Sequence, residues 1–160
     1  MKRECGSCSL CCKIMGVPEV KPDRHAWCPH ARPGAGGCSI YPRRPERCRE
    51  FSCLWLIDPK NIPDYWYPLK SKIVIDARLD GNAPYVSFIV DPDHPKRWLE
   101  QPWFGDIEHI ARTGLNGRLG QKWTTLVLIA NTAIEWTSKG WQRRDAVEDQ
   151  VHNLAAMLAG

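Results

Sequence analysis

Cysteine is missing from most of this 160-residue chain: residues 54–160 contain none, although the sequence has eight. Long apolar runs are missing too. The longest, Leu126 to Ala130, is far shorter than the roughly 20 residues that cross a bilayer. The first four residues lead directly into Cys5 without the apolar stretch of a secretory signal. We therefore expect a cytoplasmic protein without a membrane partner.

Several motifs of known chemistry are also absent. The chain has no internal repeat, no low-complexity tract and no glycine-rich nucleotide fingerprint. We find no catalytic set of residues beyond the cysteines, so an enzyme is not the first expectation. The net charge of +4 is mild and uneven: residues 1–57 carry ten Lys and Arg against five Asp and Glu, a net charge of +5, which leaves −1 for residues 58–160.

All eight cysteines lie in the first third of the chain. A leading C-x2-C-x2-C-C run is followed by four separate cysteines, and the full set is Cys5, Cys8, Cys11, Cys12, Cys28, Cys38, Cys48 and Cys53. In a reducing compartment such a set favours metal binding over disulfide bonds. Thiolates are soft ligands that suit zinc, copper(I) and iron–sulfur centres. The cysteines are therefore the candidate metal ligands.

The spacing limits how these ligands can be shared. A C-x2-C pair turns two sulfurs toward one ion, and C-x2-C-x2-C is the spacing of bacterial ferredoxin clusters. The adjacent side chains of Cys11 and Cys12 diverge by about 100° on a helix or 180° on a strand. We infer that they serve different metals, or different irons of a cluster. Eight ligands then make two four-thiolate sites, or one cluster, for example [4Fe-4S], and a second site.

The run from Cys38 to Cys53 reads C-S-I-Y-P-R-R-P-E-R-C-R-E-F-S-C. With the leading C-x2-C-x2-C-C run and the isolated Cys28, it resembles the bacterial CxxCxxCC family, also called the YkgJ type. That family is described as a zinc- or iron-chelating domain. The resemblance covers about residues 5–55 and implies that all eight cysteines bind metal. It assigns no functional residue to residues 58–160.

Local charge is compatible with metal binding. A divalent ion with four thiolates carries about −2, and two such sites carry about −4, which the +5 of residues 1–57 would largely compensate. Four arginines around Cys48 are candidate N–H donors to sulfur: Arg43, Arg44, Arg47 and Arg49. His25 and His30 flank Cys28 and are weaker ligand candidates, since eight cysteines are available.

Residues 1–57 are punctuated by glycine and proline, which predicts an irregular lobe ordered by metal. We expect one helix near Cys8 to Ile14 and another from Pro45 toward Trp55. Tyr41, Phe51 and Trp55 are predicted to form a small core beside the metal lobe.

Residues 58–160 predict an α+β core that forms one unit with the lobe. Alternation and turn signals predict strands at 73–79, 85–90, 123–130 and 133–137, with a turn at 80–82. Short helices are expected after Pro95 and Pro102, and an amphipathic helix from about residue 145. The predicted fold is thus an irregular cysteine-rich lobe packed on a small antiparallel sheet with flanking helices.

The sequence favours a metal-binding protein that holds one or two zinc or iron centres through its eight cysteines. Its expected partners are metal ions and an unidentified protein. An iron–sulfur redox or auxiliary enzyme component is the main alternative, carried by the ferredoxin-like spacing. A nucleic-acid-binding zinc module is less favoured, because an isoelectric point near 8.7 is only mildly basic and no finger spacing fits.

Overall fold

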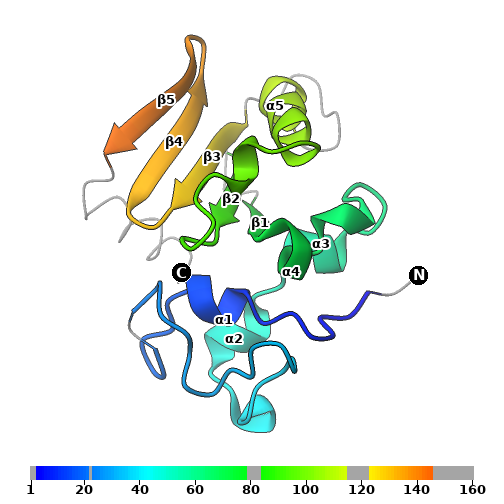
Figure 1. Cartoon of the computed structure of the whole chain (residues 1–160), viewed down its shortest axis with the longest axis vertical. Helices are drawn as coiled ribbons and strands as arrows, with labels where there is room; N and C mark the ends of the chain where they lie inside the picture. Colours follow the sequence, from blue (N-terminus) through cyan, green and yellow to red (C-terminus); the bar gives the residue numbers. More distant parts are fainter. Residues whose placement is uncertain (1–2, 22, 79–83, 115–122, 146–160) are drawn as a thin grey trace.

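The structure, a computed structural model, describes residues 3–21, 23–78, 84–114 and 123–145. These residues form a five-stranded sheet with short helices, which confirms the predicted α+β class. The strands are β1 (Ile73–Arg78), β2 (Tyr85–Val90), β3 (Thr124–Ile129), β4 (Thr132–Thr137) and β5 (Gly140–Asp145). Figure 1 shows the sheet in the upper half of the molecule and the cysteine-rich lobe below it.

The strands lie in sequence order across the sheet, β1-β2-β3-β4-β5. Every neighbouring pair is antiparallel except β2 and β3, which run parallel. A parallel pair needs a crossover, and the chain between these strands contains the longest described helix, α5 (Trp103–Thr113). The helix ends at Gly114, whose positive φ of 78° favours glycine. The sheet is therefore mostly, but not wholly, antiparallel.

The remaining helices are single turns. They are α1 (Cys11–Ile14), η1 (Tyr41–Arg43), α2 (Glu46–Glu50), α3 (Leu54–Ile57), η2 (Asp64–Trp66), α4 (Pro68–Ser71) and η3 (Arg97–Leu99). The helix expected from Pro45 toward Trp55 is divided into α2 and α3, because Phe51 and Cys53 adopt extended conformations between them. This break sets Cys53 at the start of α3, beside the sheet.

One face of the sheet carries the main hydrophobic core. Ile75, Phe88 and Val127 are fully buried on adjacent strands, and Trp66 of η2 packs on Phe88 with ring centroids 5.6 Å apart. Ile107 of α5 joins the same cluster. Each such side chain contributes about 1.5–3 kcal/mol when fully buried, so this core orders the sheet without the cysteines.

The opposite face of the sheet receives the cysteine-rich lobe. Leu10 and Ile14, beside and within α1, form a second buried cluster with Val74 of β1 and Ile89 of β2. The first four residues of β1 are therefore all buried, because the sheet is covered on both of its faces there. The lobe is thus packed directly onto the sheet.

A buried ion pair joins the lobe to the end of β2. The ammonium of Lys13 lies 2.6 Å from a carboxylate oxygen of Asp91, and the two side chains are only 6% and 7% exposed. Asp93 accepts a second hydrogen bond from Lys13 at 2.5 Å. Burial alone would lower the pKa of Lys13, but the hydrogen bonds to Asp91 and Asp93 raise it above its usual value. The charge is therefore retained inside the protein.

Some expectations differ from the structure. Strand β5 was not predicted, because Gln142, Arg143 and Arg144 lack the alternation of apolar and polar residues that marks a half-buried strand. Tyr41 does not join a core: it is 57% exposed and its ring stacks on the guanidinium of Arg44. The turn predicted at 80–82 and the helix predicted from about residue 145 lie outside the described residues.

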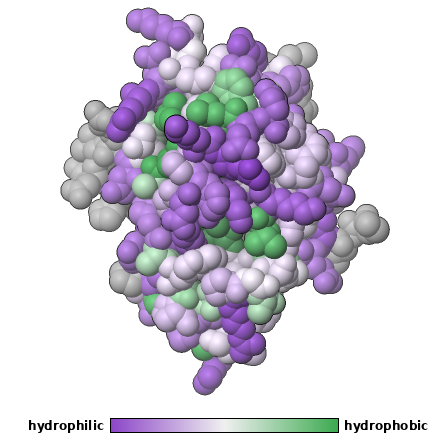
Figure 2. Space-filling model, in the orientation of Figure 1, coloured by the Kyte–Doolittle hydropathy of each residue, from purple (hydrophilic) through white to green (hydrophobic). Residues whose placement is uncertain are grey.

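Within the described ranges, no helix combines the length and apolar character needed to cross a bilayer. In the view of Figure 2 the surface is mostly hydrophilic, with hydrophobic residues in separate smaller areas.

Replacing Lys13 by methionine should lower the free energy of unfolding by about 3 kcal/mol, because Asp91 would stay buried without its counter-ion. Urea unfolding followed by tryptophan fluorescence would measure the loss. Lys96→Met, at an exposed position, is the matched control and should change stability by less than about 0.5 kcal/mol. Equal stability of the two variants would show that the buried pair does not anchor the lobe.

Candidate metal centre

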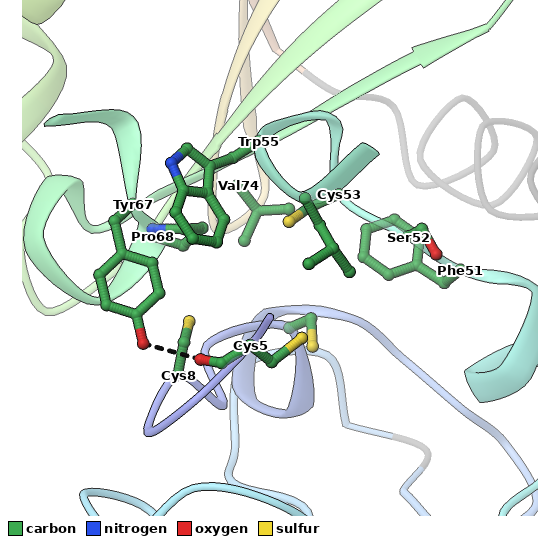
Figure 3. A pocket seen from close by; sticks show the side chains of 11 residues that line it. Cys5, Cys8, Phe51, Ser52, Cys53, Trp55, Tyr67, Pro68 and Val74 are labelled. Atoms are coloured by element: carbon green, nitrogen blue, oxygen red, sulfur yellow. Dashed lines mark hydrogen bonds between the residues drawn. The ribbon is translucent and has the colours of Figure 1, made fainter. Parts of the chain in front are cut away.

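Four of the eight cysteines line one pocket. Cys5, Cys8, Cys11 and Cys53 border a small cavity that is partly open to solvent. In Figure 3, Cys5 and Cys8 lie across the cavity from Trp55, and Cys53 lies on the same side as Trp55, beside Val74. Three of these residues come from the N-terminal run and one from the start of α3. The C-x2-C-x2-C triad and a distant cysteine therefore share one space.

Aromatic and aliphatic side chains form the rest of the pocket. Trp55 and Tyr67 face each other with ring centroids 4.7 Å apart, and Phe51 and Val74 complete the wall. The hydroxyl of Tyr67 donates a hydrogen bond of 2.7 Å to the carbonyl of Cys5 (Figure 3). The wall therefore also holds the backbone that presents the first thiol.

Arg3 also holds the N-terminal segment in place, through contacts with Trp55 and Ile62. Its guanidinium lies 4.7 Å from the Trp55 ring centroid and donates hydrogen bonds to the carbonyls of Trp55 and Ile62, at 2.6 and 2.7 Å. The amide of Cys8 donates to the carbonyl of Cys5 at 2.9 Å, and Gly6 between them has a φ of 54°. A tight turn at a glycine thus brings Cys5 and Cys8 to the same side.

The other four cysteines gather beside α1 and α2. Cys12 ends the leading run, Cys28 and Cys38 lie in the irregular segment, and Cys48 lies in α2. The amide of Cys28 donates to the carbonyl of Cys12 at 3.0 Å, and Cys38 forms an isolated bridge with Ala31. The pKa of Cys48 is raised by burial first and then by the charges of Cys12, Cys28 and Cys38. Cys48 therefore lies within electrostatic range of the other three thiols, and Cys12 lies also within range of Cys5, Cys8 and Cys11.

Cys11 and Cys12 are where the two groups meet. Cys11 lines the pocket, whereas Cys12 is not among the pocket residues and its carbonyl binds Cys28. The two thiols still touch: a hydrogen bond between them raises the pKa of Cys11 well above its usual value, and burial adds to this effect. The same hydrogen bond lowers the pKa of Cys12 to about 7, helped by the charge of Lys21 and opposed by burial. Cys12 is therefore the more readily deprotonated thiol of the pair.

Protonation differs across the pocket as well. Burial raises the pKa of Cys53 to about 11 and also raises the pKa values of Cys5 and Cys8. A metal must displace protons from these thiols, because only thiolates bind it. Any metal in the pocket would therefore bind more tightly as pH rises.

One buried cation, Lys21, lies at the second group, and the sequence did not single it out. Lys21 is only 4% exposed, and its ammonium donates to the carbonyls of Lys13 and Cys12. Burial lowers its pKa to about 8, against the opposing charges of Asp23, Cys28 and Cys12. A guanidinium nitrogen of Arg24 is buried and has no hydrogen-bond partner among the described residues. This cationic setting suits four anionic thiolates.

Three of the four arginines expected to contact sulfur have other partners, and Arg47 lies 4.0 Å from a carboxylate oxygen of Glu19. Arg44 donates to the carbonyl of Tyr41 and Arg49 to that of Arg44, at 2.9 and 3.0 Å. The histidines also have other neighbours: Asn131 lies 3.4 Å from a ring nitrogen of His25, and Ser39 lies 3.4 Å from one of His30. Lysine, rather than arginine or histidine, is the cation whose charge acts on Cys12 and Cys28.

None of the eight cysteines, all of which lie in described segments, forms a disulfide. Across residues 3–21, 23–78, 84–114 and 123–145, no three Cys, His, Asp or Glu side chains form a set that could hold a metal ion. The thiols are gathered into two groups but not closed around a point. Metal binding would require side-chain rotations that bring the sulfurs of one group together.

Comparison with known proteins assigns no relative. No family model matches the chain, and neither the curated proteins nor the solved structures contain a match. The resemblance to the CxxCxxCC family therefore stays a prediction from the cysteine pattern.

In the reduced, metal-free protein at pH 7, iodoacetamide should modify Cys12 before Cys53. About half of Cys12 is thiolate at that pH, because its pKa is about 7, whereas Cys53, with a pKa of about 11, is almost entirely protonated. Each pH unit well below 7 should slow the Cys12 reaction about tenfold. Timed alkylation with peptide mass spectrometry measures both rates.

Cys11→Ala is the informative variant for this reaction, because it removes the hydrogen bond that lowers the Cys12 pKa. Cys12 should then react more slowly at pH 7. Equal rates at Cys12 and Cys53 in the unaltered protein would contradict the assigned difference in protonation.

Proposed function

We propose that the protein binds metal ions through two four-thiolate sites. The first site consists of Cys5, Cys8, Cys11 and Cys53, and the second consists of Cys12, Cys28, Cys38 and Cys48. The observation that supports the proposal is that all eight cysteines are free, that four of them line one pocket, and that the charges of the other three act on Cys48. Four thiolates are a complete ligand set for a tetrahedral ion.

The chemistry of both groups supports metal over an organic ligand. Soft thiolates select zinc, copper(I) or iron–sulfur centres, and the cavity of the first site is bordered by four of them. The second site has the buried Lys21 beside it, and a four-thiolate complex of charge about −2 would add to the negative charge of Asp23 near this cation. Metal binding thus accounts for groups that are otherwise costly to bury.

The cysteine pattern adds support from sequence. The resemblance to the CxxCxxCC family implies a zinc- or iron-chelating role and the same eight residues. Free thiols at this density also favour a reducing compartment such as the bacterial cytoplasm. Beyond the metal ions, the natural partner would be a protein that supplies or receives them.

An iron–sulfur redox component is the second candidate, and one feature of the pocket favours it. Cys5, Cys8 and Cys11 have the ferredoxin spacing, and Cys53 is the distant fourth cysteine that shares their cavity. An iron–sulfur cluster there would supply one-electron transfer. The apolar wall of Trp55 and Phe51 would limit its contact with water.

Metal and acid-labile sulfide analysis of protein purified without oxygen distinguishes the candidates. Two zinc ions per chain, no sulfide and no colour are expected for two four-thiolate zinc sites. Iron with matching sulfide and a broad absorbance near ~400 nm would instead support the cluster in the pocket. Protein without bound metal that carries four disulfides would overturn both.

The division into two sites is tested by single substitutions. Cys8→Ser and Cys48→Ser should each retain one metal per chain, and the double variant should retain none, because each change breaks a different ligand set. Ser39→Ala, beside Cys38 but without a ligand atom lost, should keep both metals. If either single variant loses both metals while still folded, or keeps both, the division is wrong.

A further inference from the structure

We infer that the two proposed sites are unequal. The second site exchanges its metal, and residues 16–50 fold and unfold with it, while the first site keeps its metal on a scaffold that stays folded. This inference rests on the proposed function, because it assigns different behaviour to its two sites. Its consequence is a metal-transfer or metal-sensing role for the second site.

Residues 16–50 form no hydrophobic core of their own. Apart from residue 22, which is not described, residues 16–50 contribute no member to either hydrophobic cluster and no buried apolar side chain. Lys21 is the only buried residue described there. Ordering each residue costs about 1–2 kcal/mol of backbone entropy. Apolar burial does not offset that cost in this segment.

Regular structure in this segment is equally sparse. It consists of η1, the five-residue α2 and two isolated bridges, Val17 with Lys21 and Ala31 with Cys38. Cys28, Cys38 and Cys48 lie within the segment, and Cys12 lies in α1 just before it. A metal held by these four would close the segment back onto α1, which is the way small metal-dependent domains obtain their folding free energy.

Buried positive charge makes the folding of residues 16–50 depend more strongly on the metal. Lys21 donates only to backbone carbonyls, and a nitrogen of Arg24 has no partner in the described part of the chain. With a four-thiolate complex beside it, Lys21 faces about two further negative charges. Without the complex, the buried Lys21 keeps Asp23 as its anion and the repulsion of Arg24, which favours opening of the segment.

The first site has the opposite surroundings. Cys8 packs against the cluster of Leu10 and Ile14, and Cys53 packs against both hydrophobic clusters. The pair of Lys13 and Asp91 holds α1 on the sheet. These contacts do not involve residues 16–50. On loss of the second metal these contacts still hold Cys8 and Cys53 on the sheet, whereas the turn from Cys5 to Cys8 loses the backbone of Gly36 that packs against Gly6 and Ser7.

Exchange at the second site needs no redox partner. A competing chelator donates electron pairs to the ion as the four metal–sulfur bonds break, and each released thiolate takes a proton from solvent. Unfolding of residues 16–50 exposes the ligands one after another. The metal can then pass to an acceptor with thiolate or aminocarboxylate donors.

The test follows metal and folding together in the full chain loaded with two Zn²⁺. After addition of excess EDTA, one Zn²⁺ per chain should leave at least tenfold faster than the other. Amide hydrogen exchange measured by mass spectrometry at the same times should show residues 16–50 losing protection while β1, β2 and β3 keep theirs. A single rate for both ions, or protection lost together across the chain, would overturn the inference but not the proposed function.

Substitutions assign the fast ion to its site. Cys48→Ser should lack the fast phase, and Cys8→Ser should retain it. Lys21→Met should speed the fast phase about tenfold, the effect of losing about 1.4 kcal/mol of charge-assisted stabilisation, whereas exposed Lys60→Met should not. A fast phase that survives Cys48→Ser would assign exchange to the first site and overturn the inference. A chain that never retains Zn²⁺ would overturn the proposed zinc sites themselves.

Discussion

The buried ion pair between Lys13 and Asp91 is the constraint on which the arrangement of the molecule depends. Lys13 follows Cys12 directly, and Asp91 follows the last residue of β2, so one contact fixes the cysteine run relative to the sheet. Two charges withdrawn from water must remain paired, because separating them leaves either one buried alone. The apolar contact of Ile14 with Val74 and Ile89 lies beside this pair. Together they set where the thiols gather.

Given that anchor, α1 becomes the boundary between two chemical environments. Cys11 lines an aromatic pocket next to the core, and Cys12 lies near thiols that belong to neither described hydrophobic cluster. In the first environment burial favours the neutral form of the thiols, as at Cys53, and in the second the buried cation Lys21 lies near Cys12 and Cys28. The same ligand atom would therefore bind metal with different proton and conformational costs on the two sides, which is the basis for assigning them different roles.

Much of the fold could be predicted because it depends on local signals. Strands β1 to β4 and helix α5 follow from alternation, proline and glycine, and Phe51 and Trp55 are indeed packed beside the thiols. The misses have physical reasons. Strand β5 carries one large apolar residue, Trp141, and so shows no alternation, and Tyr41 stacks on Arg44, three residues further along. The helix expected after Pro45 breaks where Phe51 and Cys53 are extended, which brings Cys53 to the pocket. The contact of Tyr41 is local, whereas the pairing of β5 and the position of Cys53 depend on other elements.

By itself the sequence determined the number and chemistry of the thiols. It predicted that Cys11 and Cys12 diverge, because neighbouring side chains do so in any regular backbone, yet their thiols are hydrogen-bonded in the structure. Only the tertiary structure decided that Cys53 lines the pocket while Cys48, five residues earlier, does not. It also decided that Lys21 is the buried cation whose charge acts on Cys12. Burial and long-range pairing depend on the whole packed chain, and no local pattern encodes them.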